Sequence, residues 1–419
     1  MSGPRLVVVG GGFAGLYLAK RIANRPVAVS LIDRNNHHLF QPMLYQIATA
    51  ALSPGDIATP IRSILRHAKN IEVLLGEVAR IDVAGRAVEL ADGALVPYDY
   101  LALAPGARHS YFGQPQWEQL APGLKSLEDA LEIRRRVLTA FERAEREQDP
   151  AIRQRLLTFV VIGGGPTGVE LAGALAEIRK FALRRDFRRI DSRDATVMLL
   201  EAGAQLLPTY PAKLSDRAKQ SLRALGVDVR TEALVTSVEA DYVHVGEWKI
   251  PAATVIWAAG NAASPVLASL GAPLDRQGRV IVEPDCTIPG HPEVFVLGDA
   301  ASFSHEAGRS VPGVCPAAIQ MGEYAAGAIE ADLANRPRTP FRYRDKGQLA
   351  VIGRGRGVAD IGRFETAGFV AWFLWVFVHI LFLIGFRNRA VVMFEWAWSY
   401  FTFQRGARLI TGGWDAGRS

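Results

Sequence analysis

Three glycines near the start of the chain, Gly10, Gly12 and Gly15, have the spacing of a phosphate-binding turn. They follow the apolar run Leu6–Val9, which is typical of a buried parallel strand. A G-x-G-x-x-G turn lets a pyrophosphate approach the N-terminus of the next helix, where N–H groups and the helix dipole favour anions. Asp33 ends the next apolar run, about 20 residues after the glycines, where an acid can hydrogen-bond a ribose hydroxyl. These residues predict a complete βαβ unit that binds a dinucleotide.

The same pattern occurs a second time, in Gly163, Gly165 and Gly168 after the apolar run Phe159–Ile162. Its acid is Glu201, and the interval is longer because we expect the helix to continue through the basic segment 179–193. Two copies imply two dinucleotides, or one cofactor and one dinucleotide substrate. No Arg adjoins Glu201, so its carboxylate favours a free 2′-hydroxyl, and hence NADH over NADPH.

Other segments must position these turns. The buried run Val294–Leu297 ends in Gly-Asp, and Asp299 could hold cofactor hydroxyls or cap the next helix. The segment Asn35–Gln46 has no clear period and is predicted to be a functional loop. Its two histidines lack an acidic or Cys partner at ligand spacing, so no metal site is expected. Residues 78–103 alternate as a hairpin or meander would, and 126–148 predict a connecting helix with a solvated face.

Length and composition narrow the classes of protein. The chain has 419 residues, enough for two or three domains. It has two cysteines, Cys286 and Cys315, which exclude a disulfide scaffold or a cysteine-ligated metal site and suit a reducing compartment. The net charge is +6, and residues 340–419 hold all of the excess, with 11 Lys and Arg against 5 Asp and Glu.

This basic tail is also strongly apolar and aromatic, which favours a membrane surface over nucleic acid as its partner. Residues 366–386 contain no Asp, Glu, Lys or Arg, and a second aromatic run covers 390–403. Three interpretations stay open: a transmembrane helix, a buried or dimer-forming helix, and the favoured one, a pair of helices in the membrane interface. The apolar runs offer no acidic or Lys relay, so proton pumping is not expected.

The predicted fold class is α/β, with two Rossmann-like dinucleotide-binding domains and a C-terminal membrane-binding helical region. We expect residues 1–115 and 271–345 to form the first dinucleotide-binding domain, 155–270 the second, and 346–419 the membrane-anchoring region.

The motifs, with the V-I-W-A-A-G turn at 255–260, resemble two-domain flavoproteins of the pyridine-nucleotide disulfide reductase superfamily. The segments Asn35–Gln46, Ile57–Arg62 and Asp345–Arg354 narrow the resemblance to type II NADH:quinone oxidoreductase, the single-subunit respiratory NADH dehydrogenase. The likeness covers essentially the whole chain.

The resemblance implies a role for each site residue. Gly10, Gly12, Gly15 and Asp33 would bind the ADP half of a non-covalent FAD, and Asp299 its ribityl side. NADH would be bound by Gly163, Gly165, Gly168 and Glu201. The resemblance thus implies that residues 1–115 with 271–345 form the FAD-binding domain and 155–270 the NADH-binding domain.

Three further residues would be catalytic. Glu170 resembles the family's acid near nicotinamide and flavin, although a carboxylate so near a helix N-terminus could be merely dipole-stabilised. Lys346 resembles the lysine beside the isoalloxazine, where a cation would stabilise the reduced flavin, or it is a surface lysine. Gln320 matches the second Gln of the family's A-Q-x-x-x-Q quinone motif, whose first Gln is replaced here by Pro316.

We therefore expect hydride transfer from NADH to FAD and then reduction of a membrane quinone, at the cytoplasmic face of the inner (plasma) membrane. The expected partners are NADH, quinone and the bilayer surface, with a homodimer left open and no nucleic acid. One alternative is a sulfide:quinone oxidoreductase, which needs flavin-proximal cysteines; two unpaired cysteines and the intact second turn argue against it. The other is a flavin-bearing NADH sensor with little turnover.

Overall fold

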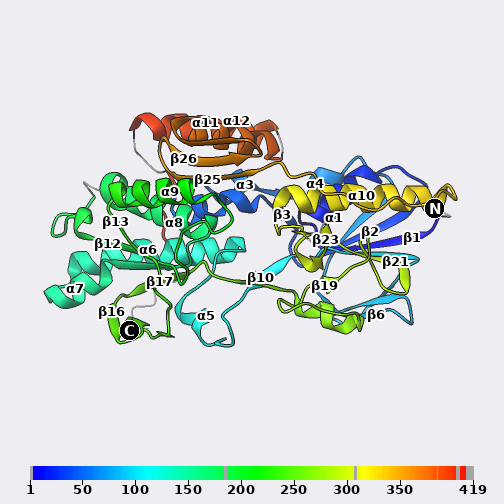
Figure 1. The fold of residues 1–419 in the computed structure, drawn as a ribbon, viewed down its shortest axis with the longest axis horizontal. Helices are drawn as coiled ribbons and strands as arrows, with labels where there is room; N and C mark the ends of the chain where they lie inside the picture. Colours follow the sequence, from blue (N-terminus) through cyan, green and yellow to red (C-terminus); the bar gives the residue numbers. More distant parts are fainter. Residues whose placement is uncertain (1–2, 184–185, 306–308, 385, 403–405, 412–419) are drawn as a thin grey trace. The chain divides into compact units, whose positions relative to one another are not determined.

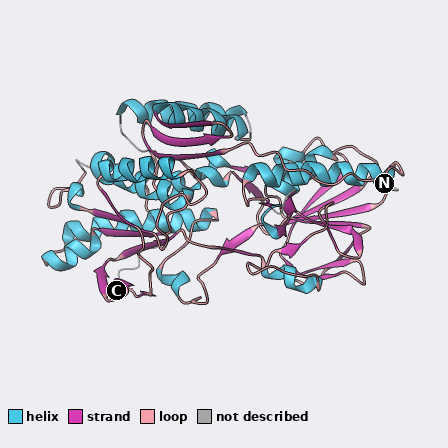
Figure 2. Ribbon diagram, in the orientation of Figure 1, coloured by secondary structure: helices cyan, strands magenta, loops and turns pink. Residues whose placement is uncertain are grey.

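The computed structural model describes residues 3–183, 186–305, 309–384, 386–402 and 406–411 (Figure 1). The chain divides into two compact units. Unit 1 comprises residues 1–39, 58–108 and 261–346, and unit 2 comprises 40–57, 109–260 and 347–419. Both units contain a parallel sheet with covering helices, coloured by type in Figure 2.

Unit 1 is built on a six-stranded sheet in the order β20-β21-β9-β1-β2-β5. Neighbouring strands from β21 to β5 are parallel, and β20 is an antiparallel edge. The bounds of its strands are β1 Arg5–Val9, β2 Ala28–Asp33, β5 Ile71–Leu75, β9 Tyr100–Leu103, β20 Thr287–Ile288 and β21 His291–Val296. Helices α1 (Phe13–Arg21) and α10 (Cys315–Leu333) pack closely, since a Cβ on Gly322 would lie 2.2 Å from the Ala14 carbonyl oxygen.

Smaller elements complete unit 1. The expected meander is confirmed as an antiparallel sheet of β6, β7 and β8. The bounds are β6 Val78–Asp82, β7 Ala87–Leu90, β8 Leu95–Pro97, β3 His37–Leu39, β4 Ala58–Pro60, α4 Ile61–Leu65, β18 Asn261–Ala263, β19 Val280–Ile281, β22 Ala301–Ser302, β23 Ser304–His305 and β24 Arg309–Ser310; β10 Ala107–His109 is where the chain passes from unit 1 into unit 2.

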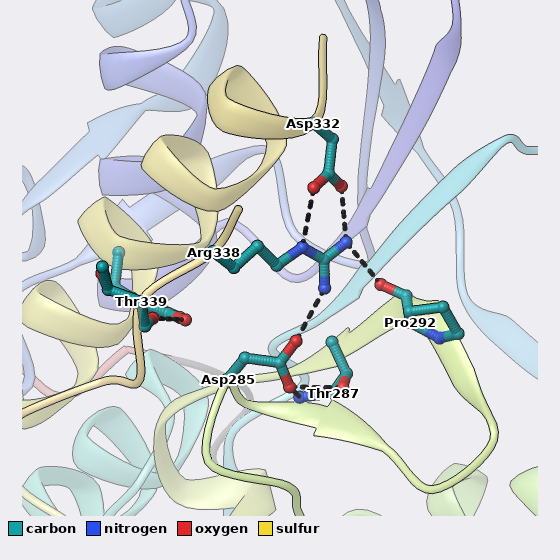
Figure 3. A network of polar contacts seen from close by, with 7 residues as sticks. Asp285, Thr287, Pro292, Asp332, Arg338 and Thr339 are labelled. Atoms are coloured by element: carbon teal, nitrogen blue, oxygen red, sulfur yellow. Dashed lines mark hydrogen bonds and ion pairs between the residues drawn. The ribbon is translucent and has the colours of Figure 1, made fainter. Parts of the chain in front are cut away.

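An arginine fixes the chain where it leaves α10 (Figure 3). Arg338 Nη1 donates to Asp285 Oδ2 at 2.8 Å, and its Nε donates to Asp332 Oδ1 at 2.9 Å. Its Nη2 donates to the Pro292 carbonyl at 2.8 Å. The two carboxylates raise the pKa of the guanidinium further above its usual range, and the partly buried side chains make these pairs stronger than surface ones. The network joins α10 to the β20–β21 edge and so anchors the segment that continues to Lys346.

Unit 2 is built on a parallel sheet in the order β13-β12-β11-β17. Its strands are β11 Thr158–Ile162, β12 Thr196–Leu200, β13 Val227–Arg230 and β17 Thr254–Trp257. A meander of β14 Ser237–Val238, β15 Tyr242–Val245 and β16 Trp248–Pro251 accompanies it. The helices are α2 Leu44–Ala48, α3 Pro54–Ile57, α5 Trp117–Leu120, α6 Leu127–Arg146, α7 Pro150–Leu156, α8 Pro166–Glu177 and α9 Ala212–Leu225. The predicted connecting helix is confirmed as α6, which begins in a capping box of Ser126 and Asp129.

The C-terminal region of unit 2 is a small antiparallel sheet and two helices. The strands are β25 Gln348–Gly353, β26 Arg356–Ile361 and β27 Phe364–Gly368, and the helices are α11 Phe369–Phe382 and α12 Phe386–Thr402. The sheet lies between α8 and α9 on one side and α11 and α12 on the other (Figure 1). The closest approach is at Gly173 on α8, where a Cβ would lie 1.8 Å from the Ile352 carbonyl oxygen.

Two expectations about local structure were wrong. The helix after the second turn does not continue to residue 193: α8 ends at Glu177, and a π-helical turn follows at Ile178–Ala182. The basic segment needs no helix, because the Glu145 carboxylate accepts backbone N–H groups of residues 188–190.

The segment 35–46 is not an irregular loop. It contains β3, which pairs with β4, and then α2, whose residues are all buried. Burial on every side explains why its apolar residues show no period.

The charge-free run 366–386 is not one helix. Its first residues complete β27, and Gly368, with φ +82°, starts the 14-residue α11. Within the described part of the chain, no helix combines the length and apolarity that a membrane crossing requires.

Candidate active site

The first glycine turn fits tightly between its neighbours. Gly10 has φ +98°, and a Cβ there would lie 2.2 Å from the Ala104 carbonyl oxygen. A Cβ on Gly15 would lie 1.9 Å from the Gly10 carbonyl oxygen. Both positions therefore require glycine for the turn to close at all.

Gly12 is different, because a Cβ there would meet nothing within 4 Å. It is the N-cap of α1, and no side chain caps that helix end. The protein itself therefore does not need glycine at this position. A phosphate bound against the helix N-terminus would need the space that the missing Cβ of Gly12 leaves open. The turn therefore fits a dinucleotide.

Asp33 lies at the end of β2, beside the turn. Its Oδ2 accepts the Gly11 N–H at 2.6 Å and its Oδ1 accepts the Asn35 N–H at 2.7 Å. Each oxygen keeps a lone pair for a further donor such as a ribose hydroxyl. The sequence pattern predicted the acid, but not that it would brace the turn.

Asp299 follows the neighbouring strand β21, in the short 3-10 turn Gly298–Ala300. Because β21, β9, β1 and β2 are adjacent and parallel, their carboxyl ends share one edge of the sheet. The structure therefore gathers Gly10, Gly12, Asp33 and Asp299 at that edge, where open α/β sheets bind ligands.

The second turn repeats the first within unit 2. Gly163 has φ +110°, and a Cβ on Gly168 would lie 1.9 Å from the Gly163 carbonyl oxygen. A Cβ on Gly165 would meet nothing within 4 Å, and no side chain caps α8. Glu201 Oε2 accepts the Gly164 N–H at 2.5 Å, and its Oε1 accepts the Gly203 N–H at 2.6 Å. Both copies thus have tight glycines at the same two positions, an open glycine at the same position and an acid that braces the turn.

Glu170 is on the first turns of α8, half-buried. Burial raises the pKa of its carboxyl from 4.5 to about 8. Two groups oppose this: the Val351 N–H, which donates to Oε1 at 3.3 Å, and the indole of Trp375 on α11. A carboxyl with a pKa near neutrality can give and take protons, which a merely dipole-stabilised carboxylate would not do.

Gln320 and Lys346 belong to unit 1. The Gln320 Nε2 donates to the Arg344 carbonyl and its Oε1 accepts the Arg344 N–H, both at 3.0 Å. The amide therefore clamps the backbone two residues before Lys346, whose side chain is exposed. One N–H and one lone pair of Gln320 stay available to another partner.

Sequence reasoning missed two kinds of residue. Trp375 lies outside both glycine motifs in the sequence, where it stands out only as part of an aromatic run. His38 was considered only as a metal ligand, but it is buried, its Nδ1 lies 2.9 Å from the Gly11 carbonyl, and burial lowers its pKa to about 4. Its place five residues after Asp33, the acid of the first turn, was the available signal.

Changing Glu170 to Gln should alter how stability depends on pH. Between about pH 4.5 and 8 the folded protein holds a proton that the unfolded chain has lost, so the free energy of unfolding falls as pH rises. The variant cannot lose that proton. As pH rises, the free energy of unfolding of the parent should therefore fall relative to that of the variant, by at most about 1.4 kcal/mol per pH unit. Because the carboxyl is partly exposed, the fall should be smaller than this limit. Urea unfolding of both proteins at several pH values measures this, and parallel curves would contradict the raised pKa.

Comparison with known proteins decides the family. A family model described as pyridine nucleotide-disulphide oxidoreductase matches residues 4–322, and the NDH2 C-terminal domain matches 346–405. The type II NADH:quinone oxidoreductase Ndh of Mycobacterium tuberculosis is 45% identical, over 97% of this chain and 90% of that protein. The chain belongs to the type II NADH:quinone oxidoreductase family. NdhA of the same organism is 44% identical, over 97% of this chain and 89% of its own length.

Solved structures support the fold of this NADH:quinone oxidoreductase family member. The structure of NDH2 from Plasmodium falciparum in complex with NADH matches with a TM-score of 0.89 at 20% identity, over 98% of this chain and 100% of that chain. The sulfide:quinone oxidoreductase of Aquifex aeolicus matches with a TM-score of 0.74, also at 20% identity, over 93% of this chain and 92% of that one. The fold alone therefore does not separate the two activities, whereas the family does.

The cysteines agree with the family assignment. Neither Cys286 nor Cys315 forms a disulfide, and burial raises the pKa of the Cys286 thiol well above its usual range. A buried, protonated thiol is a poor nucleophile.

Proposed function

We propose that this family member oxidises NADH and reduces a membrane quinone through a tightly bound FAD, without pumping protons. The observation that carries the proposal is the duplicated turn, with an open glycine and a braced acid in each unit. One turn suits a resident cofactor and the other an exchanging electron donor. When bound, a flavin accepts hydride from a nicotinamide and passes electrons to a quinone.

The first turn would hold the ADP part of FAD. Gly10, Gly12 and Gly15 would admit the pyrophosphate to the N-terminus of α1, and Asp33 would accept from a ribose hydroxyl. Asp299, at the same sheet edge, would hold ribityl hydroxyls. The family and the relatives' names support a flavin, and the dinucleotide form of the turn favours FAD over a mononucleotide.

The second turn would bind NADH by the same geometry, with Gly163, Gly165 and Gly168 at the pyrophosphate and Glu201 at the ribose. Glu170, five residues after Gly165 on α8, would hold or release a proton near the nicotinamide. Lys346 would place a cation by the flavin. Gln320 would fix the segment that leads to Lys346, while the remaining amide N–H of Gln320 contacts a quinone carbonyl.

Helices α11 and α12 would attach the protein to the membrane surface. The residues of α11 that recur every four positions, Phe369, Phe373, Phe377 and Leu381, are all more than half exposed, as are Met393, Phe394 and Trp398 of α12. Exposed apolar patches of this kind are rare unless something covers them. We propose a lipid surface as the cover, at the cytoplasmic face where NADH is available; a second copy of the chain is the other occupant that this surface would suit.

Anaerobic spectroscopy tests the function. NADH should bleach the flavin absorbance of the purified protein within its turnover time, and added quinone should restore it. Absence of bleaching would contradict the proposal. Bleaching that quinone does not reverse would favour an NADH sensor instead.

Replacing Glu201 with Gln should relax the choice of nucleotide. Removing the negative charge ends its repulsion of a 2′-phosphate, so the ratio of kcat/KM for NADPH over NADH should rise about 10- to 100-fold. Initial rates with both nucleotides measure the ratio. An unchanged ratio would show that Glu201 does not face the ribose.

A further inference from the structure

Trp375 is a buried tryptophan whose polar atom has no hydrogen-bond partner. Its side chain is 2% exposed, and its Nε1 is buried without an acceptor in hydrogen-bond geometry. Leaving a buried N–H unpaired is costly, so native proteins rarely do it without a reason.

The ring of Trp375 is held in place from several sides. It stacks on His379 with centroids 4.0 Å apart, and the tilted ring of Trp396 packs against it with centroids 5.5 Å apart. Trp396 Nε1 donates to the buried Gln46 of α2 at 2.7 Å, and Gln46 in turn donates to the Tyr45 hydroxyl at 3.0 Å. The indole of Trp375 therefore has little freedom to seek another acceptor.

The candidate acceptor for the unpaired N–H of Trp375 is the Glu170 carboxyl. The Trp375 indole is one of two groups that favour the charged form of Glu170, the other being the Val351 N–H of β25. Both α8 and α11 pack on β25, so the strand holds the two side chains in one neighbourhood.

We propose that Trp375 is a positioning residue for Glu170. The indole N–H of Trp375 donates to the Glu170 carboxyl when this carboxyl is ionised. The inference rests on the proposed function, because in that function Glu170 holds or releases a proton near the nicotinamide. It adds that α11, whose other face carries the exposed Phe373 and Phe377, also controls the proton on α8.

Other titratable groups surround this carboxyl. Tyr210, before α9, is buried, and both Glu170 and Asp360 of β26 raise its pKa. On α11, burial lowers the pKa of His379 to about 4, so the imidazole is neutral at pH 7. Glu177, two turns along α8, accepts the Arg354 N–H at 2.6 Å. The raised pKa keeps the Tyr210 phenol neutral at pH 7, so it adds no charge beside Glu170, whereas the indole would assist ionisation of this carboxyl.

The experiment titrates Glu170 directly in the flavin-loaded protein. Infrared difference spectra over pH follow the carboxyl C=O band, which is identified by its loss in Glu170→Gln. In Trp375→Phe the apparent pKa should rise by about one unit above its starting value, which is about a tenfold weaker acid. Trp396→Phe is the matched control, because its indole donates to Gln46, and it should leave the pKa of Glu170 unchanged.

A second variant guards against loss of packing. Benzothienylalanine in place of Trp375 keeps the ring size and replaces only the N–H by sulfur, and it should produce the same rise. No rise in this variant, or an equal rise in Trp396→Phe, would overturn the inference. Flavin bleaching by NADH in the parent protein is recorded separately, so failure of the proposed function would be seen without any variant of Trp375.

Discussion

A Gly165→Ala variant should remain folded and yellow, yet lose its response to NADH. The added Cβ meets no protein atom within 4 Å, so the turn can keep its shape. It would occupy the space that the pyrophosphate of NADH needs against the N-terminus of α8. We expect kcat/KM for NADH to fall at least about 100-fold, or about 2.7 kcal/mol. Flavin content should be unchanged, because the first turn is in the other unit.

Gly168→Ala makes the complementary test. Its Cβ would lie 1.9 Å from the Gly163 carbonyl oxygen, so the turn must open. This variant should lose NADH binding and thermal stability together, whereas Gly165→Ala should lose binding alone. Gly327→Ala, in α10 with open space around its Cβ, is the control and should keep both. Normal NADH kinetics in Gly165→Ala would show that NADH does not bind at this turn.

The first turn should respond in the same way through the cofactor. Gly12 is open as Gly165 is, and an alanine there should yield a folded protein that is depleted of flavin. Absorbance after purification reads this directly. The pair of open-glycine variants thus assigns one turn to the resident cofactor and the other to the donor.

The motifs at the strand ends were predictable because they are local. Each glycine turn and its acid lie within one βαβ unit. The two strands of the unit pair in parallel, so the acid at the end of the second strand must lie beside the turn that follows the first. The structure places Asp33 and Glu201 as the pattern requires, each beside its own turn. It also shows what the pattern did not contain, namely that each carboxylate braces the turn itself.

Long-range partners were not predictable in this way. Glu170 and Val351 are 181 residues apart, and Gln46 and Trp396 are 350 apart. No local period reports such contacts, because they depend on how α8, α2 and the C-terminal helices pack. The same limit applies to the tail: its lack of charge left a single long helix over 366–386 open, but pairing with β26 draws the first residues of this run into a strand.

Replacing Phe373 and Phe377 with Glu should release the protein from membranes. Both side chains are more than half exposed on the same face of α11, while Trp375 between them is buried. Burying a Phe side chain in an apolar medium is worth about 1.5–3 kcal/mol, so two losses together should weaken binding to vesicles more than about 100-fold. The added charges work in the same direction, because anionic lipids repel them.

The activity should then depend on which quinone is offered. With a long-chain quinone confined to vesicles the double variant should be more than about tenfold slower, because protein and substrate no longer meet. With a water-soluble short-chain quinone the rate of the double variant should stay near that of the parent. The substitutions are on the exposed face of α11, whereas Trp375 is on its buried face and Glu170 is on α8. Leu234→Glu with Leu95→Glu adds the same charge at exposed leucines outside α11 and should bind vesicles normally. Unchanged vesicle binding of the α11 variant, with a change in oligomeric state instead, would mean that this face contacts a second copy of the chain rather than lipid.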